Sequence, residues 1–282
     1  MSKTIIFSEY TYHLLPLETE QTALELHGPK PTFEVLKKTK NTVFDEIIKT
    51  LEDAKKERNL FKLIDNTDNM YLFKVSNKKY FKKFEDFTGT EVKTEPYVYV
   101  IINNDPEVQK IYISEDIEVF SSVNATKTVL ITIFKKYLHL KYLNIETSEV
   151  FDAKSFWTLV REHQGKIKYI NIEMIKPNLA SISKSLPDAF RKFAENTNAH
   201  RSNILLKAPE NGRLEKINES NKDLEGLVDY SSKGGGEIKV KVKGITKQLK
   251  TSDNIKKTYI AQVYLEGSHD QVLKMYKEII EN

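Results

Sequence analysis

Hydrophobic and polar positions repeat with two different periods along the chain, and the change of period separates expected strands from expected helices. Alternation with period two covers residues 3–17 and returns in 60–77, 95–104 and 110–116, which predicts a meander of strands. Spacings of three and four predict helices from Thr32 and around 124–143. In the first helix, the lysines are expected mostly on its solvated face: Lys37, Lys38, Lys40, Lys55 and Lys56.

The second half of the chain mixes both periods without a regular order. Helices are expected at 152–165 (with Asp152 as N-cap), 181–196, 223–227 and after Ser268, and strands at 167–175, 204–206, 237–243 and 259–265. The break "KPN" at 176–178 separates two of these elements. Because strands and helices do not alternate regularly, the pattern predicts an α+β fold. We expect two closely packed halves, 1–150 and 151–282, each with a mostly antiparallel or mixed sheet and helices.

Composition narrows the class of protein. The chain has 282 residues, of which 39% are hydrophobic and 30% charged, and no run approaches the roughly 20 apolar residues of a membrane span. The N-terminus alternates like a strand and does not resemble a signal peptide, so we expect a cytoplasmic protein with no membrane partner. The absence of cysteine excludes disulfides and thiolate chemistry. The six histidines form no HxxxH pair, so neither a metal site nor a cofactor is expected.

Positive charge is concentrated in one segment. Residues 233–257 carry eight lysines and two acids, whereas the whole chain has a net charge of only +4. If the strands 237–243 and 259–265 pair as a hairpin, its lysines can follow a phosphate backbone of DNA or RNA without reading bases. The candidate contacts are Lys239, Lys241, Lys243, Lys247, Lys250, Lys256 and Lys257. An acidic surface of a partner protein, or simple protection of a sheet edge, would use the same lysines.

An enzymatic alternative starts from the stretch "VDYSSKGGGEIKVKVKG". Asp229, Glu237 and Lys239 follow the order of a Mg²⁺-dependent nuclease of the PD-(D/E)xK type, in which carboxylates hold the metal and a lysine stabilises charge. Alternation on a half-buried strand explains the same residues equally well. Asp86, Glu91 and Lys93 form a second match, in a segment that is less clearly a hairpin, so the motif is not specific. Mg²⁺ is expected only under this alternative.

Other features have simpler interpretations. The triple glycine at 234–236 follows Lys233 and precedes a strand, which indicates a flexible turn and not a phosphate loop. His269 and Asp270 could form a metal pair, but Ser268 and Gln271 favour a capping box that opens the last helix. His139 is expected on the surface. Trp157 is expected in the core, with an interface anchor as the alternative.

Three stretches form a further pattern: "VFSSVNATKTVLITIFKKYL", "SFWTLVREHQGKIKYINIEMIKPN" and the Gly-rich stretch quoted above. Together they resemble uncharacterised bacterial proteins encoded near phage-defence or mobile-element genes. The resemblance implies a setting, an antiviral defence assembly with a protein partner, and no catalytic residues. The sequence therefore favours a non-catalytic component that binds nucleic-acid backbone, with the nuclease and a structural adaptor subunit as alternatives.

Overall fold

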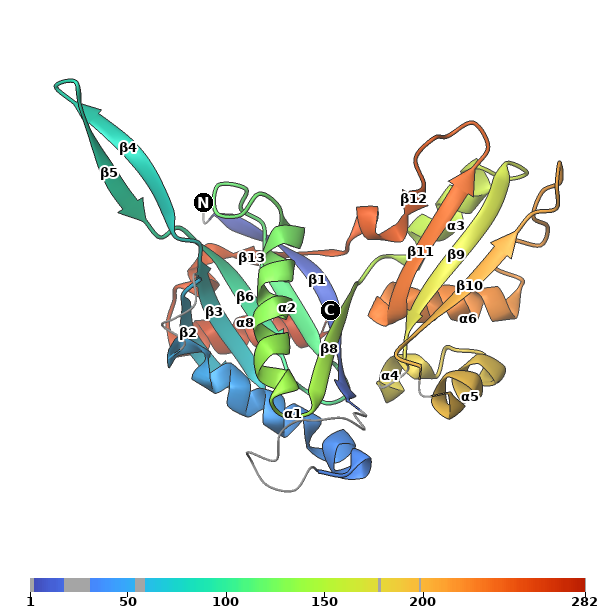
Figure 1. Cartoon of the computed structure of the whole chain (residues 1–282), viewed down its shortest axis with the longest axis horizontal. Coiled ribbons are helices and arrows are strands. Elements are labelled where there is room, and N and C mark those ends of the chain that lie inside the picture. The colour runs from blue at the N-terminus through green and yellow to red at the C-terminus, as the bar shows by residue number, and fades with distance from the viewer. Residues whose placement is uncertain (1–2, 18–30, 54–58, 177–178, 198, 282) are drawn as a thin grey trace.

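The computed structural model describes residues 3–17, 31–53, 59–176, 179–197 and 199–281 (Figure 1). This part of the chain contains eight α-helices and thirteen strands. All pairings between these strands are antiparallel. The expected α+β class is therefore confirmed. The expected break at 176–178 falls largely on Pro177 and Asn178, and Lys55 and Lys56 also lie outside the described residues.

A seven-stranded sheet forms the larger part of the molecule. Its strands, in spatial order, are β13 (Lys257–Ala261), β1 (Thr4–Pro16), β7 (Lys110–Ser114), β6 (Tyr97–Asn103), β3 (Met70–Ser76) and β2 (Phe61–Thr67). The seventh strand, β8 (Leu143–Glu149), pairs with the second half of β1, on the side where β13 pairs with its first half. The strand β1 therefore contacts three other strands, and its residues from Phe7 to Pro16 are buried.

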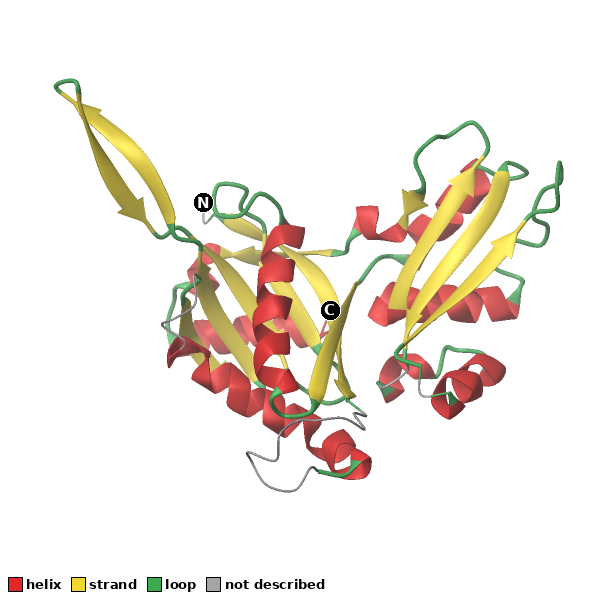
Figure 2. Cartoon of the chain, in the orientation of Figure 1, coloured by secondary structure: helices red, strands yellow, loops and turns green. Residues whose placement is uncertain are grey.

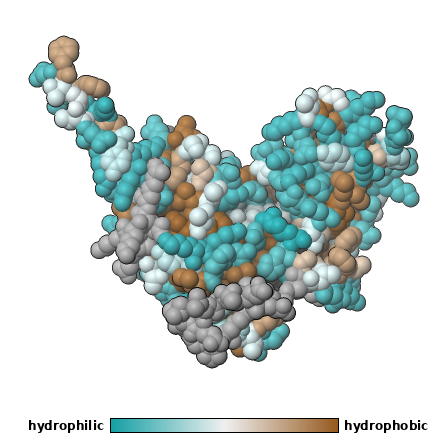
Figure 3. Space-filling view, viewed as in Figure 1, coloured by the Kyte–Doolittle hydropathy of each residue, from teal (hydrophilic) through white to brown (hydrophobic). Residues whose placement is uncertain are grey.

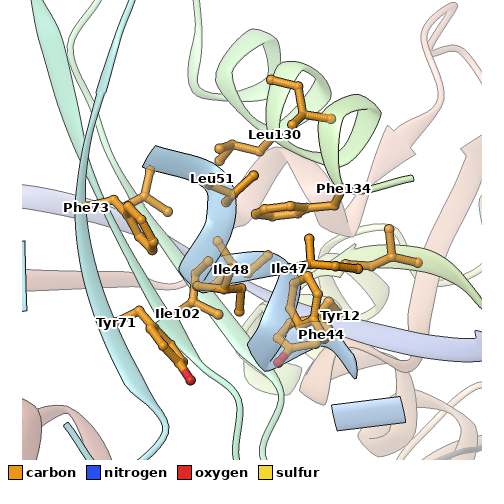
Figure 4. Close-up of a cluster of buried hydrophobic side chains, with 14 of the residues drawn as sticks. Tyr12, Phe44, Ile47, Ile48, Leu51, Tyr71, Phe73, Ile102, Leu130 and Phe134 are labelled. Atoms are coloured by element: carbon orange, nitrogen blue, oxygen red, sulfur yellow. The ribbon is translucent and has the colours of Figure 1, made fainter. Parts of the chain in front are cut away.

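Helices cover both faces of this sheet. One face packs against α1 (Phe33–Thr50) and α2 (Val123–His139), where Phe44 meets Tyr12 and Phe134 at ring-centroid distances of 5.2 Å (Figure 4). The other face packs against α7 (Gln262–Leu265) and α8 (His269–Glu281). Because both faces are buried, the strands carry apolar residues at successive positions, as in "YVYVIIN" of β6.

A smaller sheet has one covered and one open face. Its order is β10 (Arg201–Lys207), β9 (Ile167–Ile175), β11 (Gly236–Val242) and β12 (Leu249–Lys250). The helices α3 (Ala153–Glu162) and α6 (Lys222–Tyr230) pack on one face through a separate apolar core and lie behind the strands in Figure 2. Trp157 belongs to this core and is 6% exposed, which agrees with its expected place there.

Several expected boundaries differ from the structure. The expected helix 181–196 is two helices, α4 (Ala180–Ser183) and α5 (Asp188–Asn196), because Pro187 lacks the N–H that would continue the first one. The expected strand 259–265 ends at Ala261 and continues as α7. Residues 257–281 pack on the first sheet, so the expected C-terminal half of 151–282 does not correspond to one sheet.

The most visible difference is an arm formed by β4 (Lys79–Glu85) and β5 (Thr88–Thr94), which extends from the body in Figure 1. The expectation that this segment is less clearly a hairpin is therefore wrong. The two strands pair residue by residue from Lys79–Thr94 to Glu85–Thr88. Asp86 and Phe87 make the turn, with φ of 47° and 59°.

Lys40 also departs from the expectation of a solvated lysine. It is 8% exposed, because it lies four residues from both Leu36 and Phe44 on the buried stripe of α1. Burial, with the charge of Lys37 near by, lowers the pKa of the Lys40 ammonium from 10.5 to about 8. The neighbouring Lys37 and Lys38 are exposed as expected.

The triple glycine joins the two sheets. Gly234 and Gly235 belong to a π-helical turn, η2 (Ser231–Gly235), and Gly236 begins β11. The turn packs against β1: Thr11 Oγ1 donates to Lys233 O at 2.7 Å, and His13 Nε2 donates to Gly234 O at 2.8 Å. A Cβ atom on Gly234 would lie 2.4 Å from Thr11 Cβ, and one on Gly236 would lie 1.8 Å from Glu173 O. The glycines are therefore required for close packing at this joint.

We expect Gly234→Ala to destabilise the protein much more than Gly244→Ala. Both glycines have positive φ, 87° and 85°, so both substitutions carry the backbone cost of about 1 kcal/mol. Only Gly234 meets a neighbour, whereas no atom lies within 4 Å of the added Cβ at Gly244. The overlap should add about 1–3 kcal/mol to the loss in free energy of unfolding, measured by urea denaturation. Equal losses in the two variants would contradict close packing at the joint.

Lys40 predicts a pH dependence of stability. Its pKa is lower in the folded protein, so the unfolded chain binds more protons between pH 8 and 10.5, and the free energy of unfolding rises with pH in that window. Relative to Lys40→Met, the wild-type protein should gain about 3 kcal/mol between these two pH values. Urea denaturation at a series of pH values measures the difference, and a difference that stays constant with pH would show that Lys40 titrates normally.

Candidate functional site

The open face of the smaller sheet presents its side chains in three rows across the strands. The register of β10, β9, β11 and β12 sets these rows: Lys207–Tyr169–Lys241, then Leu205–Asn171–Lys239–Lys250, then Asn203–Glu173–Glu237. Four lysines thus lie in the first two rows and both glutamates in the third. Figure 3 shows that this face of the molecule is mostly hydrophilic. The face is therefore mostly polar, with Leu205 as an exposed apolar residue in the second row, and it is basic at one end.

The basic end extends into the loops beside it. The backbone N–H of Lys243 donates to Lys166 O at 2.8 Å, which brings these two exposed lysines together next to the first row. Lys247 follows in the loop before β12, with a side chain that is 75% exposed. We call this group the basic end, and it comprises Lys166, Lys207, Lys241, Lys243, Lys247 and Lys250. The group forms at one end of the sheet, where the strands β10 and β11 end and the loop between β11 and β12 begins.

Three hydrogen bonds hold the loop of the basic end in place. The Lys241 ammonium donates to Ile245 O at 2.8 Å and to Thr246 O. Gln248 Nε2 donates to the hydroxyl of Tyr169 on β9. The loop is thereby tied to Lys241 and Tyr169 of the sheet face, and Lys247 in this loop also pairs with Asp253 at 3.5 Å.

A hollow of about 470 Å³ lies beside the basic end, between the C-terminal end of α3 and the loop 213–218. Its lining includes three cationic side chains, Arg161, Arg213 and Lys216, and one acid, Glu215. Arg161 already pairs with Glu219 at 3.2 Å. The hollow therefore continues the positive surface of the basic end around the edge of the sheet.

Lys239 does not contribute free charge to this surface. Its ammonium lies 2.5 Å from Glu173 Oε1 and 3.0 Å from Glu237 Oε2, the two acids of the third row. The hydrogen bond to Glu173, followed by the contact with Glu237, raises the pKa of Lys239 above its ordinary value. Lys239 is thus the centre of a charge cluster with a net charge of −1.

Lys256 and Lys257 lie elsewhere, at the edge of the first sheet. Lys256 Nζ lies 3.4 Å from Oε1 of Glu9, a carboxylate that is almost completely buried, and Lys257 contacts Glu115. These lysines compensate the negative charge of acids of the first sheet. A buried carboxylate such as Glu9 requires this compensation. The expected hairpin of 237–243 with 259–265 is therefore wrong: β11 pairs with β9 and β12, and β13 pairs with β1.

Two residues of the nuclease alternative, Asp229 and Glu237, lie on opposite sides of the smaller sheet. Ile238 and Val240 point into the core below α6, so Glu237, which alternates with them, lies on the open face. Asp229 belongs to α6 on the covered face, where its carboxylate accepts from Ser185 Oγ and pairs with Lys233 at 2.7 Å. The sheet thus separates the two carboxylates that would have to share one metal ion.

Other candidate residues have structural partners. Within the described residues, no group of three His, Asp or Glu side chains is arranged to hold a metal ion. Lys93 of the second nuclease match pairs with Glu95 at 2.6 Å. His269 contacts Asp65 at 2.7 Å, and the Ser268 N–H donates to Gln271 Oε1 at 2.9 Å, which confirms the capping box. His139 is exposed, as expected.

Sequence reasoning missed Lys166 and Lys207 as members of the basic surface. Lys207 ends β10, and its register with Tyr169 places it on the same face as Lys241. Lys166 follows Gly165, whose φ of 74° turns the chain between α3 and β9. Neither lysine stands in a basic run, so only the pairing of the strands could have identified them.

Two further findings bear on function. Among the described residues, no helix is both long and apolar enough to cross a membrane. The chain matches no protein-family model, and no curated protein is significantly similar to it. The interpretation of the basic end therefore depends on its own geometry.

We expect Mg²⁺ to bind no better to the wild-type protein than to Asp229→Asn/Glu237→Gln. The two carboxylates lie on opposite sides of the smaller sheet and already have partners, so neither gains from a shared metal ion. Isothermal titration calorimetry with MgCl₂ compares the two proteins. A saturable heat that only the wild-type protein gives would contradict this expectation and restore the nuclease alternative.

Proposed function

We propose that the chain binds nucleic-acid backbone through the basic end, as a non-catalytic component. The observation that carries the proposal is the gathering of six lysines from β9, β10, β11, β12 and their loops at one edge of an open sheet face. Phosphates that are spaced along a strand need positive charges that are spread over such a length. The lysines are brought together from three separate parts of the sequence, 166, 207 and 241–250.

The chemistry of the site favours backbone contacts over base recognition. Lysine ammonium groups act as point charges toward phosphate, whereas reading of guanine edges favours the fork of arginine. Tyr169 and Leu205 lie on the same face and offer apolar surface beside the lysines. A strand with exposed bases can use such surface for stacking, so we expect single-stranded nucleic acid to bind at least as well as duplex.

The proposal also includes a setting. The proposed location is the cytoplasm, and the resemblance of the three stretches implies membership of a bacterial antiviral defence assembly with a protein partner. The binding experiment is independent of both.

Replacement of the basic end should weaken binding and its dependence on salt. In Lys207→Gln/Lys243→Gln/Lys247→Gln/Lys250→Gln, each lost phosphate contact should reduce the slope of log affinity against log salt by about 0.7 to 0.9. Fluorescence anisotropy with labelled single-stranded DNA, duplex DNA and RNA measures the slope. Wild-type affinity that is the same at low and moderate salt would overturn the proposal.

Two further variants separate the site from general charge. Lys38→Gln/Lys141→Gln/Lys154→Gln/Lys277→Gln removes the same charge from exposed lysines away from the basic end, and we expect it to bind like wild type. Glu173→Gln removes the main partner of Lys239, so the released ammonium should strengthen binding. An equal loss of affinity in the two quadruple variants would show that only net charge matters.

A further inference from the structure

The arm formed by β4 and β5 exposes an unusual amount of aromatic surface. Phe87 at its tip is fully exposed, and Phe84, Tyr80 and Phe81 are 69%, 61% and 51% exposed. Figure 3 shows the hydrophobic tip standing clear of the body. Apolar surface gathered on one projecting element of a protein marks an interaction site.

The turn at the tip is not built for stability alone. Asp86 and Phe87 both have positive φ, as the two central residues of a type I′ turn do, and glycine or asparagine is favoured there. A phenylalanine in the left-handed region is strained, and here it gains no contact in compensation because its ring is fully exposed. Its presence at the tip therefore points to a contact outside the chain.

The arm also lacks neighbouring strands. Within the described residues, β4 and β5 pair only with each other, and a two-stranded hairpin by itself is at best marginally stable in water. Both outer edges present backbone donors and acceptors to which another strand can pair. A partner that adds a strand would therefore supply what the arm lacks.

The charges of the arm do not suit a phosphate backbone. Lys83 pairs with Glu85, Lys93 pairs with Glu95, and Lys82 lies opposite Glu91 across the strands. Lysines and acids thus compensate each other along the arm. An element that is nearly neutral and rich in aromatic residues is suited to a protein surface.

The outer edge of β5 is complementary to itself. We propose that two copies of the chain pair through their β5 strands, antiparallel about a two-fold axis at Val92. In this register, Glu91 of each copy lies opposite Lys93 of the other, and the two valines face each other. Opposite charges in directly facing positions stabilise an antiparallel pair, and the two-fold axis forms each contact twice.

The backbone of β5 permits this register. In a hairpin closed by a two-residue turn, the residues that flank the turn, here Glu85 and Thr88, exchange both hydrogen bonds, and such pairs alternate along the strands. The N–H and C=O groups of Glu91 and Lys93 then point outward. These are the residues that face each other in the proposed pair, so their outward groups can form the new ladder.

The same register places apolar side chains in a continuous row. Phe81 lies beside Val92 across the arm, so the four-stranded sheet carries Phe81 and Val92 of one copy next to Val92 and Phe81 of the other. If the same register continues toward the base of the arm, Phe87 of each copy lies opposite Tyr97 of the other copy, next to Pro96. A hollow of about 590 Å³ lies there, and its lining includes Thr94, Glu95, Tyr97, Tyr99 and Val119.

The edge of β4 offers only a shorter complementary register. Pairing about Lys82 or Lys83 places that lysine opposite its own copy, and pairing about Phe81 places Lys79 opposite Lys83 of the second copy. Like charges in facing positions destabilise the pair. Pairing about Phe84 places Lys83 opposite Glu85, but only residues 83–85 overlap because β4 ends at Glu85, whereas residues 90–94 of β5 overlap about Val92. The geometry therefore selects β5 as the interface.

A charge-exchange experiment tests the pairing. We expect the wild-type chain to dimerise in sedimentation velocity at micromolar concentration, without nucleic acid. Glu91→Lys makes both facing residues basic, and Lys93→Glu makes both acidic, so each variant alone should dissociate at least about tenfold more readily. An equimolar mixture of the two variants should again dimerise, because each basic edge then faces an acidic edge.

The mixture separates pairing from effects within one arm, since mixing two chains cannot repair a fold. Lys83→Gln on β4 is the matched control and should dimerise like wild type, and circular dichroism verifies that all variants are folded. A wild-type chain that stays monomeric overturns the proposal, as does a mixture that remains monomeric. The basic end is unchanged throughout, so the result does not depend on nucleic-acid binding.

Discussion

The close approach of the glycine turn η2 to β1 is the contact on which the arrangement of the two sheets depends. Thr11 and His13 donate to the carbonyls of Lys233 and Gly234, and the bond to Gly234 satisfies a buried carbonyl. The chain also passes between the sheets at Phe151, whose N–H donates to Ser232 O and which bridges to Ile255. These crossings lie around the same turn, so a side chain at Gly234 would disturb all of them.

This joint divides the lysines of one basic segment between two environments. Lys239, Lys256 and Lys257 lie where the chain approaches or leaves the joint, and each contacts an acid. Glu9 among these acids is buried, so its charge needs compensation. Lys243 lies further along the sheet, beyond the first row and away from the glutamates of the third row, whereas Lys250 shares the second row with Lys239. The fold thereby converts a continuous run in sequence into a neutral region and a basic end.

Local patterns predicted elements better than pairings. The bounds of β9, 167–175, follow from alternation, and Asp152 caps α3 as expected, because both features depend on neighbouring residues. The pairing of β13 with β1 joins residues about 250 positions apart, and no local pattern encodes it. The arm was missed for a different reason: its turn uses Asp86 and Phe87 in place of the usual glycine. Lys40 was misplaced although its spacing from Leu36 and Phe44 is that of the buried stripe.

The two proposed surfaces lie on different parts of the molecule, and this separation matters for how they would act together. The arm extends from the larger sheet, whereas the basic end lies where β10 and β11 of the smaller sheet end and β9 begins (Figure 1). A dimer paired through β5 leaves both basic ends uncovered and holds them at a fixed spacing. Once one basic end contacts a strand, the second is confined near it, and its binding becomes an intramolecular step. Contacts that are individually weak and without base specificity can then give tight binding to a long nucleic acid while short fragments dissociate.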